Sequence, residues 1–239
     1  MHHFPDRLKP EYKQVLLDFL YEMISNNKQQ KFLETAANRT RKITVVIEDF
    51  YQPHNASALL RTCDCFGIQD VHIIEHKHKF EVIPDIVRGA SKWLTVKRYN
   101  SAYENPTTTC LNSLKDLGYE IIGTQPDAMD ENLEELSLQQ PIAIMFGREK
   151  TGLSDQAISQ CDRFMKVPMY GFTESLNVSV CAGIILHHLV WKLKSIDNHW
   201  ALSENEKLDL LIQWAFQVTR NKRNLMNTFI QKYPAASLA

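Results

Sequence analysis

Three segments of this sequence place polar side chains directly after an apolar run, where they could bind a ligand or take part in a reaction. In the first, Asn55 follows the apolar run 43–47 and precedes Arg61 by six residues. We expect Asn55 to cap a helix that carries Arg61, which would hold an amide and a permanent cation near the carboxyl edge of a sheet. Taken alone, this segment is better explained as a capped helix with one surface arginine.

The second segment follows the apolar run 142–146 and contains two glycines, Gly147 and Gly152, with Glu149 between them. Glycines at this spacing allow a tight loop in which the backbone approaches a ligand and Glu149 points inward. The segment lacks the final Gly-Lys-Ser or Gly-Lys-Thr of a Walker phosphate loop, so we do not expect it to bind a nucleoside triphosphate. An ordinary strand-to-helix turn explains it equally well.

The third segment runs from Val167 to Val180 and places Ser175, Asn177 and Ser179 at the start of an apolar helix. Capping a helix needs one such residue, so three of them indicate a further role in binding or reaction.

Short β-branched runs alternate with helical stretches between residues 43 and 196, which predicts an α/β fold with a Rossmann-like parallel sheet. Residues 1–42 are predicted as an N-terminal helical extension and residues 197–239 as a C-terminal one, with a single helix from about 203 to 233. We expect strands at 43–48, 71–74, 94–98, 119–123, 142–146 and 164–167, and helices at 56–66, 108–117, 154–160 and 178–196.

Composition excludes several classes of protein. With 44% hydrophobic and 23% charged residues, the chain of 239 residues is neither disordered nor fibrous in character. Its apolar runs are too short to span a membrane, and its first residues do not form a secretory signal, so we expect a cytoplasmic location and no membrane contact. Neither the five cysteines nor the histidines have the spacing of metal ligands, so no metal is expected.

Taken together, the three segments resemble the three sequence motifs of the SpoU family in the SPOUT superfamily of RNA methyltransferases. Asn55 and Arg61 match the first motif (N-x5-R), the run from Phe146 to Gly152 matches the second, and Val167-Pro-Met through Ser175-Leu-Asn-Val-Ser-Val matches the third. The resemblance covers about residues 37–195. It implies a sheet whose C-terminal part is tied in a deep trefoil knot.

The resemblance also implies a reaction, in which a ribose 2'-hydroxyl attacks the methyl group of S-adenosyl-L-methionine. It implies a central part for Arg61, in some family mechanisms as the base itself. Because a guanidinium is effectively always protonated, our hypothesis is instead that Arg61 holds substrate phosphate and stabilises developing negative charge. In this hypothesis Asn55, Glu149, Ser175 and Asn177 orient Arg61 and the substrate. The resemblance assigns the cofactor pocket to Thr124, Gly147, Val167, Met169 and Leu176.

The RNA substrate is less clear from the sequence, because the formal net charge is only −1. Local clusters of basic residues could still face phosphate, although solvated helix faces explain them as well. The resemblance favours tRNA, with guanosine-18 of the D-loop as the target, and implies a homodimer. Ribosomal RNA as substrate and a non-catalytic RNA-binding module remain the alternatives. The N-terminal extension 1–42 is predicted to bind RNA, and the residues predicted to do so along the chain are Lys31, Arg39, Arg41, Lys192 and Lys194.

Overall fold

The computed structural model describes residues 9–125, 131–197 and 199–236, which form two compact units. One unit comprises residues 40–200 and contains the sheet. The other joins the described residues up to Arg39 with those from Ala201 onward. The two helical extensions that we predicted as separate segments therefore belong to one helical unit.

The sheet of the larger unit is entirely parallel, with the strand order β3-β2-β1-β6-β4-β7-β5. All six predicted strands agree with observed ones to within one residue at each end, whereas β5 is not predicted from the sequence. The strands are β1 (Ile43–Glu48), β2 (Asp70–Ile74), β3 (Thr95–Tyr99), β4 (Glu120–Thr124), β5 (Glu131–Asn132), β6 (Ile142–Phe146) and β7 (Arg163–Lys166).

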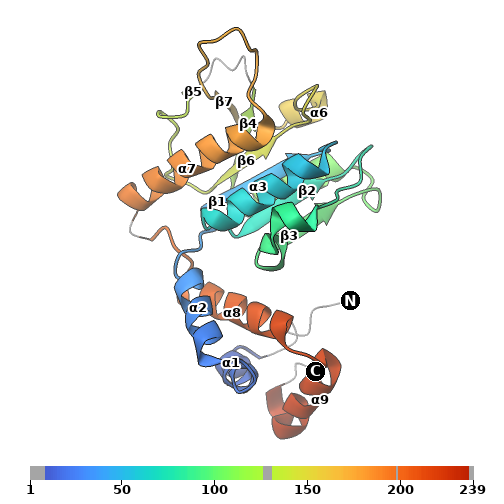
Figure 1. The fold of residues 1–239 in the computed structure, drawn as a ribbon, viewed down its shortest axis with the longest axis vertical. Coiled ribbons are helices and arrows are strands. Elements are labelled where there is room, and N and C mark those ends of the chain that lie inside the picture. Colours follow the sequence, from blue (N-terminus) through green and yellow to red (C-terminus); the bar gives the residue numbers. More distant parts are fainter. Residues whose placement is uncertain (1–8, 126–130, 198, 237–239) are drawn as a thin grey trace. The chain divides into compact units, whose positions relative to one another are not determined.

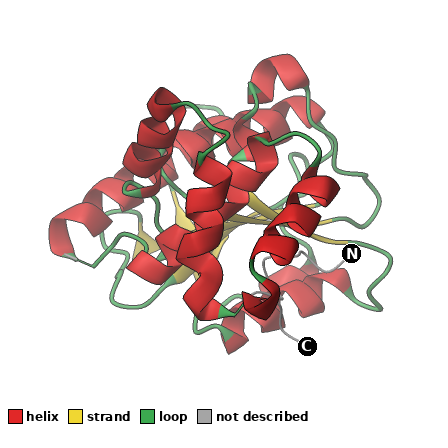
Figure 2. Ribbon diagram, turned by 90° about the horizontal axis from the view of Figure 1, so that it is seen from below, coloured by secondary structure: helices red, strands yellow, loops and turns green. Residues whose placement is uncertain are grey.

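Helices cover both faces of this sheet, which explains why β1 and β6 are buried along their whole length. Val45 and Ile47 of β1 pack with α3 and α7 in one apolar cluster, whereas Val46 packs with α5 and α6 in another. The helices and helical turns are α3 (Pro53–Cys65), α4 (Pro84–Val87), η3 (Ala90–Lys92), α5 (Pro106–Asp116), α6 (Asp155–Ile158) and α7 (Val178–Ile196). Figure 2 shows the strands between helices.

The carboxyl ends of β1 and β6 lie side by side, because the two strands are parallel neighbours in the sheet. Chain connections leave these two strands towards opposite faces, since α3 after β1 and α6 after β6 pack in different clusters. Figure 1 shows the carboxyl ends at the right of the larger unit, where α3 begins. In open α/β sheets, ligands bind at such a switch point, beyond the carboxyl ends of the strands.

The smaller unit is all-helical, and its apolar residues are buried between helices from both ends of the chain. Phe32 packs against Trp214 with ring centroids 5.7 Å apart, and Lys13 forms an ion pair with Asp209 at 2.6 Å. Its helices and helical turns are η2 (Pro10–Tyr12), α1 (Lys13–Tyr21), α2 (Asn26–Ala36), α8 (Glu204–Val218), α9 (Lys222–Lys232) and η4 (Pro234–Ala236).

The prediction of one helix over 203–233 is wrong. α8 ends at Val218, and Asn221 adopts a left-handed conformation with φ of 53° before α9 begins. Asparagine is one of the few residues that take this left-handed conformation readily. A residue in that conformation cannot lie inside a right-handed helix, so the chain must end one helix and begin another here.

Candidate active site at the carboxyl edge of the sheet

Asn55 lies at the centre of a hydrogen-bonded cluster that joins the three predicted motifs. It is 3% exposed, and its amide nitrogen donates to Glu149 Oε1 at 3.1 Å. The amide nitrogen of Asn177 donates in turn to Asn55 Oδ1 at 3.1 Å. Residues 94 and 122 positions away from Asn55 in the sequence therefore meet at one edge of the sheet.

The prediction that Asn55 caps its helix is wrong. α3 begins at Pro53, and Gln52 occupies the N-cap position. Proline favours the first position of a helix because its φ is preset and it has no N–H to satisfy. Asn55 therefore stands within the first turn, which leaves its side chain free to join Glu149 and Asn177.

Glu149 fixes the loop that leads into α3. Its two carboxylate oxygens accept hydrogen bonds from the backbone N–H groups of Tyr51 and Gln52, both at 3.1 Å. Burial alone would raise the pKa of the Glu149 carboxyl, but these N–H groups and the Asn55 amide hold that pKa below its usual value. Glu149 is therefore an ionised anchor at neutral pH and a weak proton acceptor.

The third motif contributes through the start of α7. Asn177 is the N-cap residue of α7, and its Oδ1 accepts from the Ser179 backbone N–H at 2.9 Å. The Asn177 side chain thus caps a helix with its oxygen and holds Asn55 with its nitrogen. Ser175 is exposed two residues earlier, in the loop between β7 and α7.

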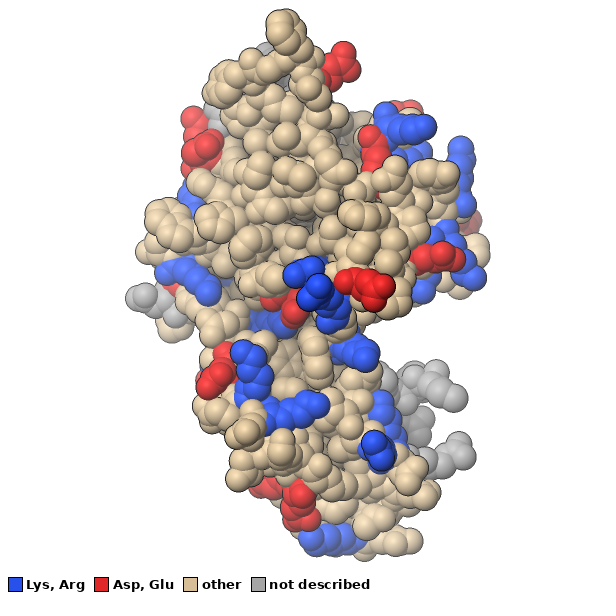
Figure 3. Space-filling model, in the orientation of Figure 1, with Lys and Arg blue, Asp and Glu red and all other residues tan. Residues whose placement is uncertain are grey.

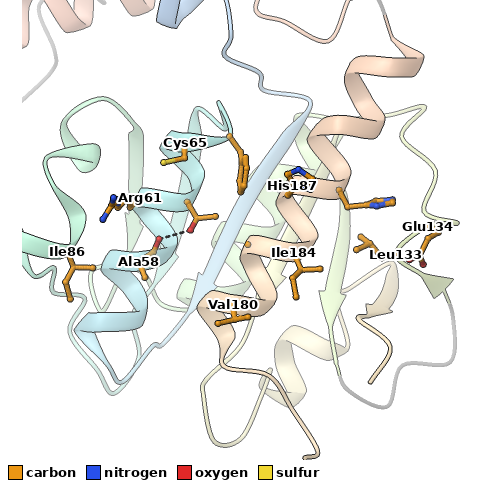
Figure 4. A pocket seen from close by; sticks show the side chains of 13 residues that line it. Ala58, Arg61, Cys65, Ile86, Leu133, Glu134, Val180, Ile184 and His187 are labelled. Carbon is orange, nitrogen blue, oxygen red and sulfur yellow. Dashed lines mark hydrogen bonds between the residues drawn. The ribbon is translucent and has the colours of Figure 1, made fainter. Parts of the chain in front are cut away.

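Arg61 does not belong to this cluster. It is exposed on α3, six residues beyond Asn55, which corresponds to a rise of about 9 Å along the helix. Its side chain lines a surface pocket of about 840 Å³ between α3 and α7, to which Val180, Ile184 and His187 of α7 also contribute. Figure 4 shows the α3 and α7 side chains on either side of this pocket, and among the described residues Arg61 has no ion-pair partner.

Two acidic residues that the sequence analysis did not select hold the loops of the site. Glu48 is fully buried, and its carboxylate accepts from the Ser154 backbone N–H at 2.8 Å and the Ser154 hydroxyl at 2.6 Å. Asp49 pairs with Arg148 Nε at 3.1 Å. The signal in the sequence was the position of an acidic pair, Glu48 and Asp49, directly after the apolar run 43–47.

A family model described as the SpoU rRNA Methylase family matches residues 42–187, which include the whole cluster. The chain belongs to this family. Relatives in the family support the assignment. A tRNA (guanosine(18)-2'-O)-methyltransferase of Borreliella burgdorferi is 36% identical over 212 residues, which are 87% of this chain and 95% of the relative. An enzyme of the same name from Thermus thermophilus is 32% identical over 161 residues, 66% of this chain and 79% of the relative.

Solved structures agree with this assignment of the fold. The crystal structure of the A. aeolicus TrmH/SpoU tRNA modifying enzyme matches with a TM-score of 0.72 and 27% identity, over 81% of this chain and 98% of that one. The SpoU methyltransferase AviRb from Streptomyces viridochromogenes, solved in complex with AdoMet, matches with a TM-score of 0.54 and 24% identity, over 68% of this chain and 62% of that one. The SpoU α/β sheet predicted from the motifs is confirmed.

The residues predicted to bind the cofactor of a SpoU enzyme follow three adjacent strands. Thr124 ends β4, Gly147 follows β6 and Val167 follows β7, and the sheet order places β4 between β6 and β7. A Cβ on Gly147 would lie 2.3 Å from the backbone carbon of Gly152, so only glycine fits this close approach. Met169 lines, with Val167, a pocket of about 350 Å³ in the loop after β7.

Leu176, the fifth residue predicted for the cofactor pocket, is 38% exposed in the loop before α7. Backbone groups at the ends of β4 and β7 and the apolar side chain of Leu176 are what an adenosine and a methionine chain need for hydrogen bonding and packing. The residues present at this edge therefore fit S-adenosyl-L-methionine.

Of the residues predicted to bind RNA, the three in the larger unit do not lie at this edge, and the other two belong to the helical unit. Arg39 is 1% exposed, with its guanidinium 5.5 Å from the Trp214 ring centroid, so its predicted contact with phosphate does not fit the structure. Arg41 pairs with Asp70 at 2.9 Å before β1 begins. At the end of α7, Lys192 donates to backbone carbonyls of residues 134 and 136, and Lys194 lies over Trp200. Lys31 is exposed on α2.

Within the larger unit, Arg41, Lys192 and Lys194 therefore lie at the amino edge of the sheet, one strand length from Asn55.

Among the described residues, no group of histidine, cysteine, aspartate and glutamate side chains could hold a metal ion. None of the described helices is both long and apolar enough to cross a membrane.

Proposed function

We propose that this SpoU protein methylates the ribose 2'-hydroxyl of guanosine-18 in tRNA, with S-adenosyl-L-methionine as the methyl donor. The observation that carries the proposal is the hydrogen-bonded cluster of Asn55, Glu149 and Asn177, which joins all three motifs at the switch point of the sheet. The Borreliella burgdorferi relative, of which 95% is covered, bears the name of this activity.

The cofactor would supply an electrophilic methyl group bound to a sulfonium. The chain's own residues must then hold a ribose 2'-oxygen in line with that methyl group and offset the negative charge that develops on it. Arg61 provides the charge, because its guanidinium is permanently protonated and faces an open pocket. Asn55, Glu149, Ser175 and Asn177 position the loops that surround the substrate, and Glu149 does so as a fixed anion.

We propose that Thr124, Gly147, Val167, Met169 and Leu176 hold the cofactor at the ends of β4, β6 and β7. The family resemblance adds the deep trefoil knot, in which the loop before α7 passes through an earlier loop of the chain. The sheet order is compatible with such threading, since β7 lies between β4 and β5 although β6 intervenes in the sequence.

A homodimer is part of the proposal. Val180, Ile184 and Trp191 of α7 are 51%, 41% and 67% exposed, and two of them line the same pocket as Arg61. A second copy of this chain would cover these apolar side chains and enclose Arg61 beside them. Light scattering should give twice the monomer mass, and Trp191→Glu should shift the equilibrium to monomers.

We further propose that the helical unit contributes to RNA binding through exposed side chains such as Lys31. The roles of Arg41, Lys192 and Lys194 in RNA binding stay predictions, since each of the three has a partner within the chain. We propose a cytoplasmic location, which the proposed tRNA substrate supports.

Methyl transfer from labelled S-adenosyl-L-methionine to unmodified tRNA tests the proposed function. Label in 2'-O-methylguanosine at position 18 is expected, and a tRNA with deoxyguanosine at that position should accept none. Label in ribosomal RNA alone would move the activity to the alternative substrate. Cofactor binding without transfer to either RNA would favour a non-catalytic module.

A further inference from the structure

A group of basic and aromatic side chains borders the proposed active site and has no role in the scheme above. It consists of Tyr51 in the loop before α3 and the segment His76–Lys79 after β2, and we refer to it as the basic rim. β1 and β2 are neighbouring parallel strands, so both parts of the rim lie at the carboxyl edge. Figure 3 shows Lys and Arg side chains among acidic ones along the side to which these strands point.

Asp49 fixes the backbone of the rim. Its Oδ1 accepts from the N–H groups of His76, Lys77 and His78 at 3.0, 2.9 and 2.8 Å. Asp49 itself takes the left-handed conformation, with φ of 52°, which turns the chain sharply at the end of β1. One buried carboxylate therefore orders three consecutive backbone groups of the rim.

The Asp49 carboxylate also joins the rim to the second motif. Its Oδ2 pairs with Arg148 Nε at 3.1 Å, next to Glu149. Burial raises the pKa of the Asp49 carboxyl, but the three N–H groups and Arg148 together lower it by more. The net pKa is therefore below its usual value. The rim is thus held to the loop that holds Asn55.

The side chains that remain available on the rim are two cations and one aromatic ring. His76 Nε2 lies 2.7 Å from Thr107 Oγ1 and is turned to the protein. Lys77 and Lys79 are exposed, and the side-chain amine of neither has a hydrogen-bond or ion-pair partner among the described residues.

Tyr51 is 64% exposed, and its ring meets the edge of the His78 ring with centroids 5.1 Å apart. The backbone N–H of Tyr51 is held by Glu149 at 3.1 Å, so this exposed ring is attached to the proposed active site itself. An exposed aromatic ring with a fixed backbone, beside unpaired lysines, is the combination that binds single-stranded nucleic acid, with bases on the ring and phosphates on the cations.

We propose that the basic rim binds the RNA substrate beside the target nucleotide, with an unstacked base on Tyr51 and backbone phosphates on Lys77 and Lys79. The proposal rests on the proposed function for the identity of the RNA, but not for the contact. A partner protein is disfavoured, because the exposed surface of the rim is cationic and contains one large apolar side chain.

Binding of an unmodified tRNA transcript, measured at several salt concentrations, tests the cations. Lys77→Ala with Lys79→Ala should weaken tRNA binding roughly tenfold at low salt and reduce the slope of log K against log salt by roughly two. The loss in turnover should appear in KM, and the affinity for S-adenosyl-L-methionine should not change.

A matched control removes two lysines from the opposite edge of the sheet. Lys92→Ala with Lys115→Ala removes the same charge, with the loss of a single exposed ion pair between Lys115 and Asp162. An equal loss of affinity and slope in the control, or an unchanged slope in the rim variant, would overturn the proposal.

Tyr51 is tested by the difference between two substitutions. Tyr51→Ala should weaken tRNA binding by about tenfold without changing the salt slope, because stacking contributes roughly 1–3 kcal/mol per base. Tyr51→Phe should restore binding, and failure of this rescue would remove Tyr51 from the proposal.

The two proposals fail in different ways. Wild-type protein that binds tRNA with the expected dependence on Lys77 and Lys79, but transfers no methyl group to it, would refute the proposed function and keep the rim. Methyl transfer to guanosine-18 with rim variants that bind like the control would refute the rim alone.

Discussion

Replacing Asn55 by aspartate should make the enzyme dependent on pH in a way that the wild type is not. The substitution keeps the side chain's shape and its acceptor for Asn177, but places a carboxylate oxygen where the Asn55 nitrogen now donates to Glu149 at 3.1 Å. Two unit charges at that distance repel by about 5 kcal/mol at an effective dielectric constant of about 20.

Water at this half-buried site screens part of that repulsion, so we expect about 2–3 kcal/mol to remain. The pair should then hold one shared proton, so the apparent pKa of the pair lies above that of the wild-type Glu149 carboxyl. In the wild type the Asn55 amide and two backbone N–H groups hold that pKa below its usual value, and the substitution removes the amide and adds a like charge.

At low pH the shared proton restores a hydrogen bond between the two carboxyl groups, and the loops of the first and second motifs stay together. At higher pH repulsion separates them, and a displacement of about 1 Å at a reacting centre costs on the order of a hundredfold in rate. The ratio of Asn55→Asp to wild-type kcat/KM should therefore fall as the pH rises, by roughly thirtyfold to a hundredfold in total.

The assay is methyl transfer to the tRNA transcript at a series of pH values, with Asn55→Ala as the control. Alanine cannot titrate, so its ratio to the wild type should be low and constant. A ratio for Asn55→Asp that is constant with pH, or that rises with pH, would refute the assignment of the Asn55–Glu149 contact to the active site.

Three further predictions concern other parts of the larger unit. Arg61→Ala should abolish turnover and leave S-adenosyl-L-methionine binding nearly intact in calorimetry, and substantial residual turnover would contradict its role. Gly147→Ala should weaken cofactor binding at least tenfold, because its Cβ would meet the Gly152 backbone at 2.3 Å and overpacking costs about 1–3 kcal/mol; an unchanged Kd would contradict this. Burial and then Lys97 lower the pKa of His72 from 6.5 to about 4, so the stability that neutral His72 contributes is fully present above pH 6.5 and is lost as the pH falls towards 4. Denaturant unfolding should show a decrease of up to about 3 kcal/mol over this window, and His72→Gln should have a flatter profile; equal profiles would contradict the burial argument.

The elements of the larger unit could be predicted from the sequence because their signals are local. β1 and β6 are largely apolar runs. α7 has Asn177 as its N-cap and a long apolar stretch as its body. The limits of these three elements were therefore predicted correctly. The start of α3 was misplaced because asparagine and proline both signal helix starts, and Pro53 at the first helical position prevailed.

The contacts of the site could not be predicted in the same way. Asn55 and Glu149 meet because β1 and β6 are neighbours, and the order of strands in a sheet is not encoded in any single segment. The family resemblance assigned Asn55, Glu149 and Asn177 to one active site. The hydrogen bonds among them and the role of Asp49 depend on backbone geometry, which the sequence does not show. Arg39 was misjudged because a cation in a basic cluster gives no indication that it is buried beside Trp214.

The helical unit is built from the first and the last parts of the chain, and this has a consequence during synthesis. Leu16, Leu17 and Leu20 of α1 are buried in the complete protein, where α1 packs against α8. α1 is complete at Tyr21, whereas α8 begins only at Glu204. At about 5–20 residues per second, α1 waits roughly ten to forty seconds on the ribosome with its apolar face uncovered. The sheet unit between them can fold in that interval. The growing chain therefore exposes the apolar face of α1 after the sheet unit has folded, until α8 has been synthesised.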